Sequence, residues 1–166
     1  MQTIRIETFI AAPPERCFDA ARDLDLHVKS MSHTGERAVA GRTSGLIELG
    51  EEVRWRARHF FVTQRFTSKI TAFDRPRHFQ DAMQRGAFRS FVHDHTFDAR
   101  GGGTLMTDVL AFAAPLGLLG RIAEGIVLRR YLTRLLAARA KVIKDAAESS
   151  CDTCRTHGEN HECDHC

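Results

Sequence analysis

The sequence predicts an α+β domain in which a curved antiparallel sheet of about six to seven strands wraps around a long C-terminal helix. Three observations predict this fold class. Apolar residues alternate with a period of two between Glu36 and Phe112, the breaks in that pattern are short enough for hairpins, and a helical period replaces it after Pro115. One strand and two short helices are expected to precede this sheet.

The first expected strand covers residues 3–12 (TIRIETFIAA), where apolar residues mark a strand that ends at a pair of prolines. A short helix is expected next, because Pro14 is tolerated in a first helical turn. Its buried side would consist of Cys17, Phe18 and Ala21. A second short helix is predicted over residues 24–31.

The middle of the chain is expected to form an antiparallel meander, because its turn signals are closely spaced. Turns are predicted at residues 41–45, around Gly50, at residues 74–76, near Gly86 and at residues 101–103. In one strand the alternation puts Val53, Trp55, Ala57 and His59 on one face and Arg54, Arg56 and Arg58 on the other, toward water. In the next strand it separates Phe66, Ser68, Ile70 and Ala72 from Lys69, Thr71 and Phe73.

Residues 79–112 place charged and imidazole groups on an apolar face. Three segments alternate with a period of two: Phe79-Asp81-Met83, Phe91-His93-His95-Phe97 and Met106-Asp108-Leu110-Phe112. Burying an unpaired Asp or His would cost several kcal/mol, so these groups either pair with one another or line a cavity. The pattern therefore predicts a binding pocket.

The long C-terminal helix is predicted from one apolar stripe. That stripe consists of Leu119, Ile122, Ile126, Leu132, Leu135 or Leu136, and Val142 or Ile143. Beside it lie Arg121, Arg129, Arg130, Arg134, Arg139, Lys141 and Lys144. We interpret these cations as a solvated face, and contact with an anionic membrane during lipid delivery is the alternative.

The order of elements resembles that of the START-like, or SRPBCC, helix-grip superfamily. The resemblance rests on FIAAPPERCFDAARD near the start, on GAFRSFVHDHTFDARGGGTLMTDVLAFAAPLG, and on the long helix that begins near Leu118. Within that superfamily the chain is similar to bacterial polyketide cyclase/dehydrase-like proteins of unassigned activity. The resemblance covers residues 1–148, which we expect to form one domain, while residues 149–166 form a separate tail.

The resemblance implies a deep cavity between the sheet and the long helix. Relatives use such a cavity for lipids, sterols, polyketides or other apolar molecules, and some of them catalyse cyclisation or dehydration there. The residues at the matching cavity-lining strand positions are Trp55, His59, Asp81, Met83, Phe91, His93, His95, Met106, Asp108 and Phe112. These residues are the predicted ligand contacts.

The imidazoles and carboxylates on these strands suit more than one role. His93 and His95 lie two apart in a strand and share a face, and Asp81 and Asp108 could pair with them as an acid–base system or as a structural polar network. His93, His95, Asp81 and Asp108 are therefore the candidate catalytic residues. A metal held by His59, His93 and His95 is a further alternative on residue type alone.

Composition and charge argue against nucleic-acid binding and against a membrane-spanning or secreted protein. The chain carries a formal net charge of +3, and residues 1–150 carry 23 basic against 17 acidic side chains, without a dense basic block. That distribution disfavours nucleic acid as a partner. No apolar stretch of spanning length and no secretory signal pattern is seen, which predicts a cytoplasmic protein whose membrane contact is at most transient.

The tail, CDTCRTHGENHECDHC, is rich in metal-binding residue types. Its candidate ligands are Cys151, Cys154, His157, His161, Cys163 and Cys166. A Cys-x2-Cys spacing lets two thiolates bind one ion, so zinc is the expected cofactor of the tail, whereas the main domain is expected to require none. Without metal this segment, which has almost no apolar residues, is expected to be disordered.

The leading functional prediction is binding of a hydrophobic or aromatic small molecule, lipid-like or polyketide-like, between sheet and helix. The first alternative is a cyclase or dehydratase that uses cavity His and Asp residues as acid and base. The second is an interaction module that responds to metal or redox state through the tail. Oligomeric state stays open, with a homodimer as an option.

Overall fold

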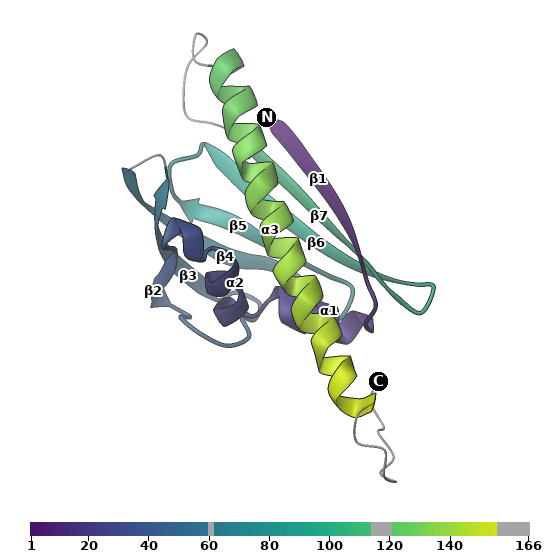
Figure 1. Ribbon diagram of the computed structural model, residues 1–166. Helices are drawn as coiled ribbons and strands as arrows, with labels where there is room; N and C mark the ends of the chain where they lie inside the picture. Colours follow the sequence, from purple (N-terminus) through teal and green to yellow (C-terminus); the bar gives the residue numbers. More distant parts are fainter. Residues whose placement is uncertain (60–61, 114–120, 156–166) are drawn as a thin grey trace.

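The computed structural model describes residues 1–59, 62–113 and 121–155. The chain forms a curved seven-stranded antiparallel sheet, two short helices and one long C-terminal helix (Figure 1). The elements are β1 (Gln2–Ile10), α1 (Pro14–Ala21), α2 (Leu24–Ser30), the 3-10 helix η1 (Ser32–Thr34), β2 (Arg37–Gly41), β3 (Glu52–His59), β4 (Val62–Asp74), β5 (His78–Arg85), β6 (Ser90–Arg100), β7 (Gly103–Ala113) and α3 (Arg121–Arg155). This confirms the predicted helix-grip architecture.

The sheet has the strand order β1-β7-β6-β5-β4-β3-β2, so β2 to β7 form a meander and the first strand closes the sheet beside the last. α3 lies diagonally across the concave side of the sheet, and α1 and α2 lie beside its C-terminal half (Figure 1). The helix packs through residues spaced by three or four: Leu132, Leu136, Ala140, Ile143 and Ala147 are all buried. The sheet thus grips one face of the helix.

Strand alternation is obeyed closely in β3, where Val53, Trp55 and Ala57 are buried. The intervening Arg54 and Arg56 are exposed, as predicted. β4 differs from the prediction at its end. A register shift between Ile70 and Ala72 turns Phe73 toward the core, where its ring lies 5.2 Å from that of Phe18.

α3 extends beyond residue 148, where the domain was expected to end. Its backbone remains helical to Arg155, so the first residues of the predicted tail, including Cys151 and Cys154, continue the helix. Residues 156–166 lie outside the described part of the chain, and with them lie His157, His161, Cys163 and Cys166. Zinc binding by the tail therefore stays a prediction.

Candidate functional site

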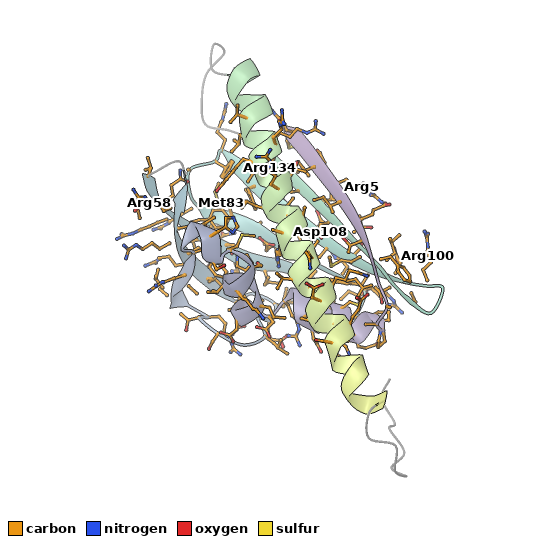
Figure 2. The ribbon with its side chains drawn as sticks, in the orientation of Figure 1. Arg5, Arg58, Met83, Arg100, Asp108 and Arg134 are labelled. Atoms are coloured by element: carbon orange, nitrogen blue, oxygen red, sulfur yellow. The ribbon has the colours of Figure 1, made fainter. Side chains whose placement is uncertain are left out.

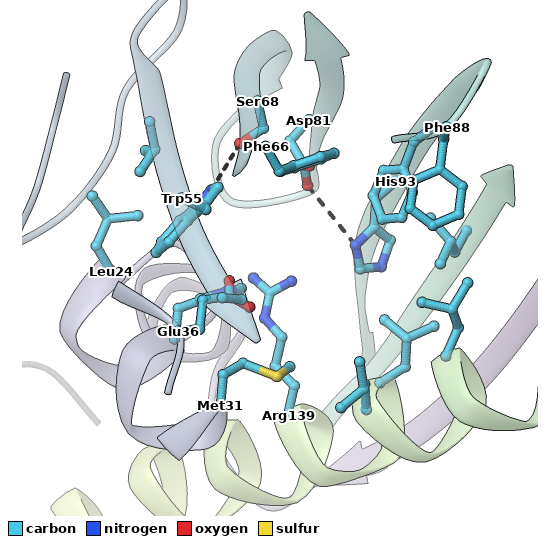
Figure 3. Close-up of a pocket in the computed structure, with 18 of the residues that line it drawn as sticks. Leu24, Met31, Glu36, Trp55, Phe66, Ser68, Asp81, Phe88, His93 and Arg139 are labelled. Atoms are coloured by element: carbon cyan, nitrogen blue, oxygen red, sulfur yellow. Dashed lines mark hydrogen bonds and ion pairs between the residues drawn. The ribbon is translucent and has the colours of Figure 1, made fainter. Parts of the chain in front are cut away.

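A cavity of about 650 Å³ lies between the concave face of the sheet and α3 (Figure 3). Its volume falls in the range of known small-molecule sites, roughly 300–1,000 Å³. The lining residues come from the α1–α2 region and the segments that follow it (Ala21, Arg22, Asp23, Leu24, His27, Met31, Glu36, Ile47), from the strands and the β5–β6 turn (Val53, Trp55, Ala57, Gln64, Arg65, Phe66, Ser68, Ile70, Phe79, Asp81, Ala87, Phe88, Phe91, His93, Leu110), and from α3 (Val127, Leu128, Tyr131, Leu132, Leu135, Leu136, Arg139).

One part of the cavity is apolar and aromatic. The ring of Phe91 lies 5.2 Å from that of Phe66 and 5.4 Å from that of Phe88, so the three rings form one continuous surface. Leu132 and Leu136 of α3 belong to the same cavity wall. Such a surface favours an apolar or aromatic ligand, because burying apolar area contributes about 25 cal/mol per Å².

Polar groups lie on another part of the wall, near α2 and the C-terminal half of α3. His27 Nε2 lies 2.8 Å from Glu36 Oε1, and the His27 ring packs 4.5 Å from the indole of Trp55. The Trp55 indole N–H donates to the hydroxyl of Ser68 at 3.1 Å (Figure 3). These contacts fix the indole, leaving its ring to form part of the wall.

Arg139 lines the cavity and anchors α3 to α1. Its Nη2 donates a hydrogen bond of 2.8 Å to the carbonyl of Ala21, and its Nε is buried without a hydrogen-bond partner among the described residues. Tyr131 lies about two helical turns before it and lines the same cavity. Burial raises the pKa of Tyr131, and the nearby Glu36 charge adds to that rise, so its hydroxyl stays protonated at neutral pH.

Four titratable side chains, Asp81, His93, His95 and Asp108, form a buried cluster on β5, β6 and β7. Strand register brings them together, because Asp81 lies opposite His93 and His95 lies opposite Asp108. The period of two puts all four on the concave face. The sequence-based expectation that the two Asp residues would lie beside the two His residues is therefore met.

The two carboxylates hold the two imidazoles from opposite sides. Asp81 Oδ1 lies 3.3 Å from His95 Nε2, a hydrogen bond, and 3.8 Å from His93 Nδ1. Asp108 Oδ1 lies 2.6 Å from His95 Nδ1 and 3.2 Å from His93 Nε2. The Asp108 contacts are close but off the hydrogen-bonding axis, so attraction between charges contributes more to them than directed hydrogen bonding.

Burial and these contacts shift the pKa values of the four side chains in different directions. Burial alone would lower the pKa of both imidazoles, and it does so for His93, where the neighbouring His95 charge adds to the effect. For His95 the contacts with Asp108 and Asp81 outweigh burial and raise the pKa. Burial would raise the pKa of both carboxyls, but the imidazoles hold the pKa of Asp81 and Asp108 below the usual range. His95 therefore holds a proton more strongly than His93 does.

The predicted ligand contacts fall into two groups in the structure. Trp55, Asp81, Phe91 and His93 line the cavity. Met83, His95, Met106, Asp108 and Phe112 do not line it. The ring of Phe79 stacks 4.2 Å from that of His95, which is fully buried beneath it. The side chain of His59 lies outside the described residues.

Sequence reasoning missed the polar groups that α2, α3 and the segment before β2 contribute to the cavity wall. Arg139 was expected on the solvated face of the long helix, and the structure corrects this by placing it on the cavity wall. The sequence contained an indication of this position, because Arg139 follows Leu135 by four residues and Leu136 by three. Residues at these spacings share a face of a helix. His27, Glu36 and Tyr131 carried no comparable signal, because their place depends on how the helices pack on the sheet.

Three members of the buried cluster could hold a metal ion. One ligand atom each from Asp81, His93 and His95 lies within 4.8 Å of the others. This set differs from the alternative raised on residue type, in which His59 took the place of Asp81.

Comparison with protein families agrees with this geometry. The family described as polyketide cyclase/dehydrase and lipid transport matches residues 1–148. The chain belongs to this family. Curated proteins gave no significant match.

Solved structures share the fold at low sequence identity. TTHA0849 from Thermus thermophilus is 20% identical with a TM-score of 0.69, covering 88% of this chain and 99% of that one. A START superfamily protein from Mycobacterium smegmatis is 14% identical with a TM-score of 0.67, over 89% and 98%. Ginseng major latex-like protein 151 from Panax ginseng is 14% identical with a TM-score of 0.62, over 88% and 97%. These likenesses show the helix-grip fold.

Across the described residues, none of the helices combines the length and the apolar character needed to cross a bilayer.

Proposed function

We propose that this family member binds a hydrophobic or aromatic small molecule, lipid-like or polyketide-like, in the cavity between the sheet and α3. The observation that carries this proposal is the cavity itself: about 650 Å³, with aromatic and aliphatic side chains over much of its wall and a few polar groups on the rest. A largely apolar pocket with a few convergent polar groups is typical of small-molecule sites.

The cavity wall fits a ligand that has both an apolar and a polar surface. An apolar or aromatic body would pack against Phe66, Phe88 and Phe91. The polar groups include a donor on Arg139, acceptors on Glu36 and Asp81, and the Tyr131 hydroxyl, which can do both. Hydroxyl or carbonyl groups on one end of the ligand would form hydrogen bonds with these side chains.

A cyclase- or dehydratase-type reaction is the second candidate, and the position of Asp81 favours it. The Asp81 carboxyl is 18% exposed on the cavity wall, and its imidazole partners hold it ionised, as a general base requires. His95 and Asp108 lie behind the wall and would act by positioning. Both nitrogens of His93 face carboxylates, so His93 is less suited to take a proton from a ligand directly.

The proposal is tested by native mass spectrometry of the full chain purified without added ligand, together with organic extraction of the same sample. A co-purifying organic mass that is retained by the protein and recovered in the extract supports binding. The variant Ala57→Trp places an indole in the cavity and is expected to lose that mass. An unliganded polypeptide under mild ionisation, or an organic mass unchanged in Ala57→Trp, would argue against an occupied cavity.

Turnover separates the two candidate functions once that ligand is identified. Asp81→Asn is expected to keep binding and lose turnover if the protein is an enzyme. If no reaction occurs with the identified ligand in the unaltered protein, the binding function stands alone. Regulation through the tail, zinc as its cofactor, a cytoplasmic location and a homodimer stay predictions from sequence.

A further inference from the structure

We propose that Asp81, His93 and His95 form a binding site for a divalent transition-metal ion of the zinc, iron or cobalt kind, set in the wall of the cavity. This site would be additional to ligand binding and does not depend on it. Two imidazoles and one carboxylate are a ligand set that such ions take in proteins.

The facing atoms are spaced as metal ligands. Asp81 Oδ1 lies 3.8 Å from His93 Nδ1 and 3.3 Å from His95 Nε2, and one ligand atom from each of the three residues lies within 4.8 Å of the others. Metal–ligand bonds of about 2.0–2.2 Å hold neighbouring ligand atoms roughly 3–3.5 Å apart. The distance from Asp81 Oδ1 to His95 Nε2 already fits this spacing, and the distance to His93 Nδ1 exceeds it by a few tenths of an ångström.

Asp108 supplies what a metal-bound histidine needs on its other side. The nitrogens that do not face Asp81, Nε2 of His93 and Nδ1 of His95, lie 3.2 Å and 2.6 Å from Asp108 Oδ1. In metal sites the outer imidazole N–H is usually held by a carboxylate or carbonyl, which fixes the ring orientation. Here the Asp108 carboxylate lies close to that nitrogen of both rings, although neither contact is aligned as a hydrogen bond.

Charge also favours a cation. Asp108 has a side-chain exposure of 5% and Asp81 of 18%, so two carboxylates share one largely buried site with two imidazoles. A divalent ion bound by Asp81, His93 and His95 would add positive charge beside both carboxylates, which favours its binding. Arg139 of α3 lines the same cavity, and its charge interacts with both Asp81 and His95.

The site would be open toward the cavity. Asp81 and His93 line the cavity, whereas His95 is fully buried behind them. Three protein ligands leave further coordination positions for water or for a ligand, the arrangement of metal sites that act on bound molecules. A polar group of a molecule in the cavity could occupy those positions.

The test is a Co²⁺ titration of the full-length chain, first stripped with chelator. Because the tail carries its own thiols and imidazoles, its four cysteines are changed to Ser and its three histidines to Ala in every protein compared. The absorption spectrum of bound Co²⁺ reports coordination by nitrogen and oxygen atoms. Displacement of Co²⁺ by Zn²⁺ then gives the affinity of the site for Zn²⁺.

Asp81→Asn is expected to lower the affinity roughly 100-fold, and Asp108→Asn about 10- to 100-fold. Asp94→Asn is the matched control: it makes the same change on the opposite face of β6, where Asp94 pairs with His78 at 3.0 Å, and should leave affinity unchanged. If Asp81→Asn does not fold, His93→Gln replaces it, with His78→Gln as its control.

The proposal fails if the tail-substituted protein does not bind Co²⁺. It fails equally if Asp81→Asn, or His93→Gln in its place, binds as tightly as its control, because the ion would then lie elsewhere. Circular dichroism of each metal-free variant distinguishes loss of a ligand from loss of the fold.

Discussion

Asp108 has the largest effect expected of any single residue in the buried cluster. Its carboxylate contacts both imidazoles and is almost fully buried. Asp108→Asn would remove the buried carboxylate that contacts both imidazoles, so the variant should lose about 3–5 kcal/mol of unfolding free energy. Chemical denaturation of metal-free protein checks this. A loss as small as that of Asp94→Asn, whose pair is partly exposed, would show that Asp108 contributes little to stability.

The pH dependence of stability can be predicted at Asp19. Burial alone would raise its pKa, but hydrogen bonds from Arg75 and Arg22 outweigh burial and lower it. A carboxyl with a lowered folded-state pKa adds stability above its unfolded value near 3.8, and that stability disappears as pH falls through the folded value.

Asp19→Asn should therefore cost roughly 0.5–1 kcal/mol near neutral pH and almost nothing in strong acid. Denaturation of both proteins across this range measures the difference. A difference that stays constant with pH, or grows in acid, would contradict the assignment.

Residue patterns predicted the buried cluster but not its exposure to the cavity. The period of two fixed the shared face of Asp81, His93, His95 and Asp108, and the meander order made them neighbours. Which of them reaches the cavity depends on tertiary packing. Phe79 stacks over His95, and the spacing of residues along one strand carries no information about such a cover.

At the scale of elements, the β2–β3 connection depends on Gly41. Its φ is +75°, and a Cβ there would lie 2.1 Å from the carbonyl oxygen of Glu52, so both backbone conformation and space exclude a side chain. Gly35 has a φ of +64° but open space around it.

Gly41→Ala should consequently cost more than Gly35→Ala, which carries only the conformational penalty of about 1 kcal/mol. Thermal unfolding of the two variants compares them directly. Equal losses would mean that the strand pair shifts to accept the methyl group.

Elements were predicted better than their local irregularities. The helix and strand order follows from periodicity and turn residues, and the structure confirms it. The register shift that turns Phe73 inward lies between Ile70 and Ala72, where no glycine or proline marks it. The position of Arg139 was misjudged for a related reason: a helix that is gripped on a wide face buries side chains at the edge of its apolar stripe.

At the scale of the whole molecule, the cavity follows from the curvature of the sheet. A long helix touches a curved sheet closely at some places and leaves space elsewhere, and side chains fill only part of that space. α3 packs tightly through Ala140, Ile143 and Ala147 toward its C-terminal end, while the cavity lies along the preceding turns. Figure 2 shows the solvated side chains that surround this interior, among them Arg58, Arg100 and Arg134.

Ligand binding in this cavity is tested most directly by an equilibrium titration with Nile red, a neutral dye that fluoresces in apolar surroundings. The proteins compared are the unaltered chain, Ala57→Trp, which fills the cavity, and Arg56→Trp, which adds the same side chain on the exposed face of β3. We predict saturable binding to the unaltered chain and Arg56→Trp, and at least about tenfold weaker binding to Ala57→Trp, a loss of about 1.4 kcal/mol. Equal binding to all three folded proteins would contradict a ligand site between the sheet and α3.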